Sequence, residues 1–214
     1  MAKHIGDEIV YYYDLHPTRE DLMGETFIHR MLVQYLMDLL MWLFHGQRCA
    51  IYANLNFYQT SEYKEEPLAP DIAVIQGVDV QDVTSWRVNK TGPAPQVVFE
   101  IGSEKTWKND LEEKPLQYAR MGVQEYFAYD PNKHPLRKGT ASRLFGWQLD
   151  PASNEMREMS LRPDGSLWSA HLNSLLVPDE QYLRLYDRSG QPRLTRAEAL
   201  AEKLRSLGVD PDQL

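Results

Sequence analysis

Gln96-Val97-Val98-Phe99-Glu100-Ile101 is the stretch that decides the fold, because this apolar run predicts a buried β-strand. It follows Gly92-Pro93-Ala94-Pro95, a run of turn-forming residues. A helix is predicted next, over about residues 110–121, and a further strand over residues 125–130. Because Pro115 lies inside this helix, either its first turn is irregular or the regular helix starts nearer Pro115. A helix between two strands indicates a crossover and at least one parallel pair of strands. The sequence therefore predicts an α/β fold.

The chain before this strand predicts one long helix and two more strands. The helix runs over about residues 25–44 and has apolar residues on more than one face, which is typical of a buried helix. His29 and Asp38 lie within it, and a charge at mid-bilayer depth is costly, so a membrane-spanning helix is disfavoured. The strands are predicted over residues 49–58 and 71–75.

The chain after residue 131 predicts an antiparallel β extension and a final helix. The expected hairpin strands are residues 143–149, 155–161, 166–169 and 181–186. Thr195 and Glu198 have the spacing of a capping box at the start of the helix. Leu200, Leu204 and Leu207 give this helix an apolar stripe, which packs either on its own domain or on a partner chain, and we expect the first.

Composition narrows the classes of protein that the chain can represent. The 214 residues are 43% apolar and 25% charged, an ordinary balance for a globular protein. Cys49 is the single cysteine, which excludes an internal disulfide and fits a reducing, cytoplasmic compartment. Residues 1–13 lack the pattern of a signal peptide. The net charge of −8 argues against a broadly basic nucleic-acid surface, so any DNA contact has to be a local patch.

Two carboxylates stand where an isolated charge would be costly. Glu100 lies inside an apolar strand, on the face opposite Phe99 and Ile101, and Asp71 opens another apolar run directly after Pro70. Taken alone, Asp71 could be a turn aspartate and Glu100 could form a buried ion pair. Together, on successive buried strands, they favour an acidic site. Hard cations such as Mg²⁺ prefer oxygen ligands of this kind.

The sequence resembles the Uma-type family of restriction endonucleases, in the nuclease superfamily named for the PD-(D/E)XK motif. The residues that carry the resemblance are Pro70-Asp71, Val98-Phe99-Glu100-Ile101-Gly102-Ser103, Asp110-Leu111-Glu112-Glu113-Lys114, Tyr118, Ala119, Gly122, Val123, Glu125-Tyr126-Phe127 and Asp130-Pro131. A weaker likeness extends from about residue 17 to the end of the chain.

The resemblance implies a restriction-endonuclease-like mixed sheet flanked by helices, in one domain over residues 1–214. Its core would cover about residues 18–131, its antiparallel β extension about 140–187 and its C-terminal helix about 195–207. The implied activity is hydrolysis of DNA phosphodiester bonds by an endonuclease that depends on Mg²⁺ or Mn²⁺. In such folds Asp71 and Glu100 hold the metal together with the main-chain carbonyl of Ile101, and a lysine orients or deprotonates the attacking water.

The chain departs from the superfamily motif at Gly102, where a lysine is expected two positions after the glutamate. Lys114 is the candidate for a displaced lysine, since helical spacing puts it on one face with Asp110 and Tyr118. Lys105 is the second candidate. The alternative for Lys114 is an ordinary solvated lysine on a helix.

The remaining candidates have weaker signals. Glu25, at the start of the long helix, could add an acid to the site, or could simply suit the helix dipole. Tyr118 could hydrogen-bond a phosphate, although packing is the favoured interpretation. The clearest basic cluster comprises Lys133, His134, Arg137, Lys138 and Arg143. It could contact DNA phosphates, or be an exposed loop.

The leading hypothesis is thus a metal-dependent DNA endonuclease in which Asp71, Glu100 and Lys114 are catalytic. A homodimer would suit the cutting of two strands. The rival hypothesis is a catalytically inactive nuclease fold that acts as a binding or scaffold protein. Gly102 at the usual lysine position and the net charge of −8 favour this rival. An enzyme acting on another class of phosphoester is a third interpretation.

Overall fold

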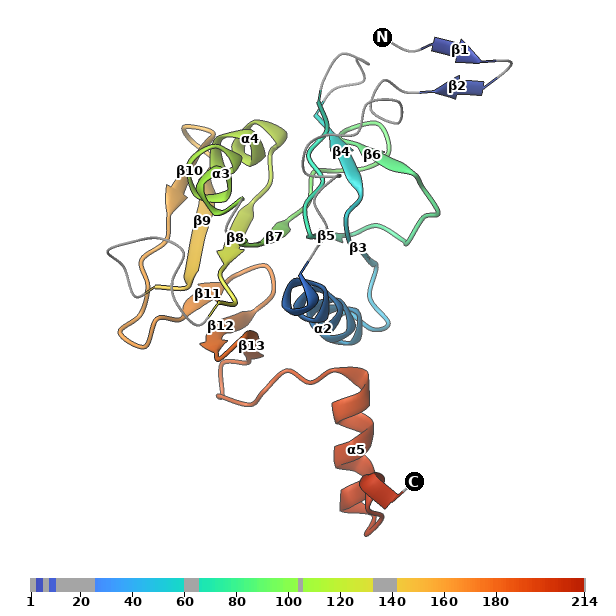
Figure 1. Ribbon diagram of the computed structural model, residues 1–214, viewed down its shortest axis with the longest axis vertical. Coiled ribbons are helices and arrows are strands. Elements are labelled where there is room, and N and C mark those ends of the chain that lie inside the picture. The colour runs from blue at the N-terminus through green and yellow to red at the C-terminus, as the bar shows by residue number, and fades with distance from the viewer. Residues whose placement is uncertain are drawn as a thin grey trace.

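A six-stranded mixed sheet forms the centre of the structure, a computed structural model that describes residues 3–5, 8–10, 26–59, 66–103, 106–132 and 142–213 (Figure 1). Its strands follow the order β10-β9-β8-β7-β5-β3. They are β3 (Cys49–Tyr52), β5 (Ile72–Gln76), β7 (Val97–Ile101), β8 (Glu125–Tyr129), β9 (Leu144–Asp150) and β10 (Glu155–Glu158). Strands β7 and β8 are parallel, and the other neighbours are antiparallel. The predicted α/β class and the predicted parallel pair are confirmed.

Two short helices, rather than one, connect β7 to β8. They are α3 (Trp107–Glu112) and α4 (Lys114–Met121). Pro115 lies in the first turn of α4, where its missing N–H costs nothing, and Gly122 ends α4 with a left-handed φ of 85°. Asp110 lies inside α3, so a helix start at this residue was wrong, whereas the alternative start near Pro115 agrees with α4, which begins at Lys114.

The faces of the sheet are covered by different helices. The long helix α2 (Phe27–Leu43) begins after Thr26, whose hydroxyl accepts the N–H of His29. Its apolar residues share one core cluster with Phe99 of β7, whereas Val98, the next residue on β7, belongs to a second cluster with Tyr118 of α4. The strand alternation therefore gives α2 one face and α4 the other. Among the described residues, no helix combines the length and apolarity needed to cross a bilayer.

Smaller sheets surround this centre. Strands β11 (Leu167–Ser169), β12 (Ser174–Asp179) and β13 (Tyr182–Tyr186) form an antiparallel sheet. Strands β4 (Asn56–Tyr58) and β6 (Ser85–Arg87) form a parallel pair, and β1 (Lys3–Ile5) and β2 (Glu8–Val10) an antiparallel pair.

Three features of the β structure differ from the prediction. The strand predicted over residues 49–58 is divided into β3 and β4, because Asn54 between them has a left-handed φ of 52°. Strands β1, β2, β6 and β12 were not predicted. The expected extension is divided too, since β9 and β10 continue the central sheet while β11 and β13 belong to another.

The C-terminal helix α5 (Arg196–Ser206) begins with the predicted capping box of Thr195 and Glu198, and the short 3₁₀ helix η1 (Pro211–Gln213) follows it. Figure 1 shows α5 extending away from the sheets. No residue of α5 is buried, and Leu200 and Leu207 are 53% and 65% exposed. The expectation that its apolar stripe packs on its own domain was therefore wrong for most of the stripe.

Candidate functional site

Asp71 and Glu100 meet where strands β5 and β7 pair. Ile72 is opposite Phe99 in the antiparallel register, and one further residue along the register brings Asp71 opposite Glu100. Glu100 is on the same face of β7 as Val98, which is the face that α4 covers. Both carboxylates are buried, with exposed fractions of 9% for Asp71 and 4% for Glu100. The convergence of the two acids at one end of the sheet is thus present in the structure.

Asp71 is held from two directions. Its Oδ2 atom accepts the main-chain N–H of Ile101 at 2.6 Å, and its Oδ1 atom lies 3.1 Å from Nε2 of His29 on α2. Ile101 is therefore beside Asp71, as the candidate site requires. The main-chain amide of Ile101 makes the contact, whereas the sequence predicted a role for its main-chain carbonyl. These two contacts fix the orientation of the carboxylate at the strand end.

Lys114 bridges two carboxylates. Its Nζ atom lies 3.0 Å from Oε1 of Glu100 and 2.9 Å from Oδ1 of Asp110, one helical turn earlier. The hydroxyl of Tyr118 also donates to Oε1 of Glu100, and the Tyr118 ring packs against Tyr126 with ring centroids 4.9 Å apart. Lys114 is 8% exposed, so the interpretation of an ordinary solvated lysine is wrong.

The cluster carries more negative charge than Lys114 alone offsets. Burial raises the pKa of Glu100 to about 8, and the nearby Asp71 and Asp110 add to this, while Lys114 and the Tyr118 hydroxyl oppose it. Burial also raises the pKa of Asp110, against the opposing effect of Lys114. For Lys114, burial lowers the pKa but Glu100 and Asp110 raise it further, so the amine stays an ammonium. A further cation would stabilise the ionised carboxylates.

The chemistry of these donors fits a hard divalent cation. Mg²⁺ takes oxygen ligands and is commonly held by one or two carboxylates with waters, which Asp71 and Glu100 can supply. Within the described ranges, no group of three or more His, Cys, Asp or Glu side chains is arranged to hold a metal ion. The residues present thus fit a two-carboxylate site completed by water and main-chain oxygen, but not a cage made of side chains.

Five of the residues predicted to act in the site fall outside the described residues. These are Glu25, Lys105, Lys133, Arg137 and Lys138. Their roles stay predictions. Of the remaining candidates, the structure brings Asp71, Glu100, Ile101, Lys114 and Tyr118 together around one end of β7.

Sequence reasoning missed two members of the cluster. Asp110 was placed on one helix face with Lys114 but was not named as a site residue, although its position four residues before Lys114 is the spacing at which a helix pairs opposite charges. His29 was noted only as a residue of the long helix, but its Nε2 contacts Asp71 far along the chain. No local pattern could have revealed this second contact, because it depends on how α2 crosses the end of the sheet.

Comparisons with known proteins relate the chain to nucleases. The model of the Uma2 family, which is described as "Putative restriction endonuclease", matches residues 19–171. A crystal structure described as a putative nuclease belonging to DUF820, from Anabaena variabilis, is similar at 14% sequence identity and a TM-score of 0.46. That similarity covers 70% of this chain and 75% of the other. No curated protein matches the chain.

Proposed function

This chain belongs to the Uma2 family of restriction-endonuclease-like proteins, and on that basis we propose that it is a divalent-metal-dependent endonuclease that hydrolyses phosphodiester bonds in DNA. The observation that carries the proposal is the buried arrangement of Asp71 and Glu100 with the ammonium of Lys114 3.0 Å from Glu100. A cluster of carboxylates with one lysine is the donor set that phosphodiester hydrolysis at a metal site uses. The enzyme would act in the cytoplasm.

The carboxylates of Asp71 and Glu100 would hold Mg²⁺ or Mn²⁺, with the main-chain carbonyl of Ile101 as a third oxygen. When bound, such an ion polarises the phosphate and lowers the pKa of a bound water. The protein's own part is to keep these oxygens in place. The Ile101 amide and His29 orient Asp71, and the hydroxyl of Tyr118 orients Glu100.

Lys114 would act as a fixed positive charge and hydrogen-bond donor, not as a base. Its pKa is raised by Glu100 and Asp110, so Nζ keeps its proton and cannot remove one from water. An ammonium at this place can orient the attacking water and offset the charge that develops on the phosphate. Asp110, 2.9 Å from Nζ, positions Lys114 for this role.

DNA would reach the site through a local basic patch. Lys133, Arg137 and Lys138 are our candidates for phosphate contacts. A homodimer would supply one site for each strand of a duplex. We propose both on the strength of the nuclease assignment.

The test is cleavage of supercoiled plasmid and of single-stranded DNA with Mg²⁺ or Mn²⁺, comparing wild type with Glu100→Ala and Lys114→Ala. We expect no cleavage by Glu100→Ala, and a loss of about 10²–10³-fold in rate for Lys114→Ala, as for the removal of other preorganised donors. Lys108→Ala is the matched control, because Lys108 lies on neighbouring α3 but is an exposed partner of Glu112. Circular dichroism must show that each variant is folded. Full activity of Glu100→Ala would exclude this mechanism.

A non-catalytic binding or scaffold protein is the second candidate function. It is favoured by Gly102 at the usual lysine position, and by the two ion pairs of Lys114, which already give Glu100 and Asp110 a charged partner. Absence of cleavage by wild type, together with absence of Mg²⁺ binding in calorimetry, would support this function instead.

A further inference from the structure

Tyr126 of β8 is a buried tyrosine packed beside the candidate site. It is fully buried, and it belongs to the same core cluster as Val98 of β7 and Tyr118 of α4. The ring centroid of Tyr126 is 4.9 Å from that of Tyr118 and 5.1 Å from that of Trp147 on β9, which stacks on it. Because two aromatic rings pack against it in a closely packed core, the Tyr126 ring has a fixed orientation.

The hydroxyl of Tyr126 connects β8 to the end of α3. It donates to the main-chain carbonyl of Asp110 at 2.8 Å. The last four carbonyls of a helix lack partners within that helix, and in α3 the carbonyl of Asp110 is one of them. Burial raises the pKa of Tyr126, and the nearby Glu100 and Asp110 raise it further, so the hydroxyl keeps its proton and stays a donor. Tyr126 therefore ties the end of α3 to the sheet.

The residue that Tyr126 holds is also the residue that holds Lys114. Oδ1 of Asp110 is 2.9 Å from Nζ of Lys114, and the same Nζ atom is 3.0 Å from Oε1 of Glu100. Helix α3 ends at Glu112 and α4 starts at Lys114, so the helix is interrupted between Asp110 and Lys114. The hydrogen bond from Tyr126 thus supplies a fixed point where the helical geometry is irregular.

We propose that Tyr126 is a positioning residue of the candidate active site, whose hydroxyl holds Asp110, and through it the Lys114 ammonium, in place beside Glu100. The proposal rests on the nuclease function proposed above and adds one residue to its machinery. A small displacement of a catalytic group can cost much of the rate, so a hydroxyl that does not touch the substrate still affects catalysis. The opposing explanation is that Tyr126 only stabilises the core.

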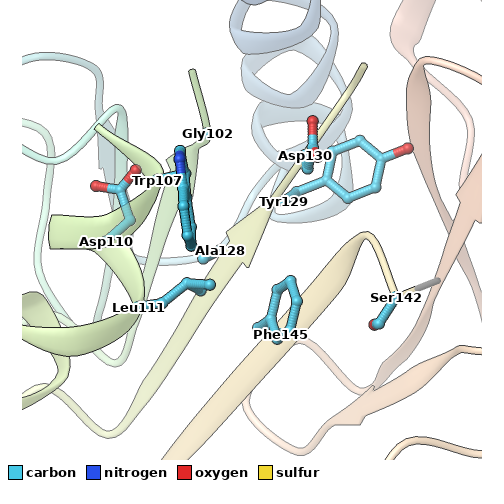
Figure 2. Close-up of a pocket in the computed structure, with 9 residues that line it drawn as sticks. All are labelled: Gly102, Trp107, Asp110, Leu111, Ala128, Tyr129, Asp130, Ser142 and Phe145. Carbon is cyan, nitrogen blue, oxygen red and sulfur yellow. The ribbon is translucent and has the colours of Figure 1, made fainter. Parts of the chain in front are cut away.

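Tyr129 offers a matched control on the same strand. Its side chain is also buried, and its hydroxyl also donates to a main-chain carbonyl, that of Tyr182, at 2.7 Å. It belongs to the core cluster on the α2 face, and Figure 2 shows its ring on the opposite side of β8 from Asp110. Tyr126→Phe and Tyr129→Phe each leave one buried carbonyl without this donor, so both should lower Tm. Only Tyr126→Phe should affect Lys114.

The first test needs neither metal nor DNA. The ammonium signals of ¹⁵N-labelled lysine side chains are followed by NMR in the full chain with EDTA, and the signal of Lys114 is the one missing in Lys114→Ala. We expect Tyr126→Phe to shift or broaden this signal, and Tyr129→Phe to leave it as in wild type. An unchanged Lys114 signal in Tyr126→Phe, or an equal change in both variants, would overturn the proposal.

Trp147→Phe is a second variant for the case in which Tyr126→Phe does not fold. It keeps the Tyr126 hydroxyl but loosens the stack that orients the Tyr126 ring. We expect the Lys114 signal to move in this variant too. A Lys114 signal that stays in its wild-type position would count against the proposal.

The second test is the rate of DNA cleavage with Mg²⁺. Tyr126→Phe should lower kcat by about 10- to 100-fold with little change in KM, because the ammonium is displaced while the carboxylates remain. In the Lys114→Ala background the same change should cause no further loss, since Tyr126 acts through Lys114. Tyr129→Phe should keep the wild-type kcat. A wild-type kcat in Tyr126→Phe, or losses that add independently in the double variant, would contradict the positioning role.

The two tests separate this proposal from the nuclease function. Metal-dependent cleavage together with an unchanged Lys114 signal in Tyr126→Phe would overturn the role of Tyr126 alone. A displaced Lys114 signal in a protein that cuts no DNA would overturn the nuclease function, and with it any catalytic meaning of the contact.

Discussion

Glu100 shows at the residue scale how burial makes a carboxylate sensitive to pH near neutrality. Its side chain is 5% exposed, and the acids Asp71 and Asp110 are its neighbours. Burial is the largest cause that raises its pKa, from 4.5 to about 8. The folded protein therefore holds a proton on Glu100 over a pH range in which the unfolded chain has lost it.

We predict that the metal-free protein loses stability as pH rises from about 4.5 to about 8, the window between the two pKa values. In this window the folded state binds more protons than the unfolded state, so the free energy of unfolding falls with increasing pH. The raised pKa of Asp110 acts in the same direction. Urea unfolding at several pH values in EDTA measures the effect.

Glu100→Gln is the control for this pH dependence, because an amide of the same shape does not titrate. Its stability should change less with pH than that of wild type. Under the proposed function, saturating Mg²⁺ should also reduce the slope, since the ion would bind the ionised carboxylate. Identical slopes in wild type and Glu100→Gln would show that Glu100 is not the group responsible.

Gly146 illustrates, at the scale of elements, how two sheets come close enough to share a core. It lies on β9 between Phe127 of β8 and Leu167 of β11. A Cβ atom at this position would be 2.7 Å from Cδ1 of Leu167 and 3.0 Å from the ring of Phe127. Both neighbours are fully or almost fully buried, so neither can move away easily.

We predict that Gly146→Ala lowers the free energy of unfolding by about 1–3 kcal/mol, the usual cost of overpacking a core. The measurement is equilibrium unfolding in urea. Adding Leu167→Ala should relieve the clash, so the double variant should be more stable than the sum of the two single effects. Strict additivity would mean that the two side chains do not compete for the same space.

The elements that sequence reasoning predicted well are those with a local signal. Strands β7 and β8 are continuous apolar runs, and α5 has both halves of a capping box. The break between β3 and β4 depends on the single left-handed residue Asn54, within a run that otherwise has strand character. Within the candidate site, Glu100 was found through its apolar surroundings, whereas Lys114 was chosen because the family resemblance implies a lysine and helical spacing puts Lys114 on one face with Asp110 and Tyr118. His29 was missed because its contact with Asp71 is long-range.

On the scale of the whole molecule, the core continues beyond the part that the family model matches. That match ends at residue 171, but Leu176, Leu183 and Leu185 of β12 and β13 are fully buried in the same cluster as α2. Helix α2 and strand β13 thus share one core, which supports our proposal that the chain forms one domain. Helix α5 is outside this core.

We predict that removing divalent metal with EDTA leaves the protein folded, with unchanged far-ultraviolet circular dichroism. The raised pKa of Glu100 lowers the negative charge of the metal-free cluster, and Lys114 gives Glu100 and Asp110 a charged partner. Adding Mg²⁺ at about 100 times its dissociation constant should stabilise the fold by about 2.7 kcal/mol, or roughly 5–10 °C in Tm. Glu100→Ala should show no such rise. Unfolding in EDTA would instead identify the metal as part of the fold.

The bridge that Lys114 makes between two acids also bears on how the protein is produced. Lys114, the positively charged partner of these acids, is part of the chain itself and follows Asp110 by four residues. Folding therefore does not have to wait for an ion from the surroundings, and under the function proposed above the supply of magnesium would govern when the protein works rather than whether it matures.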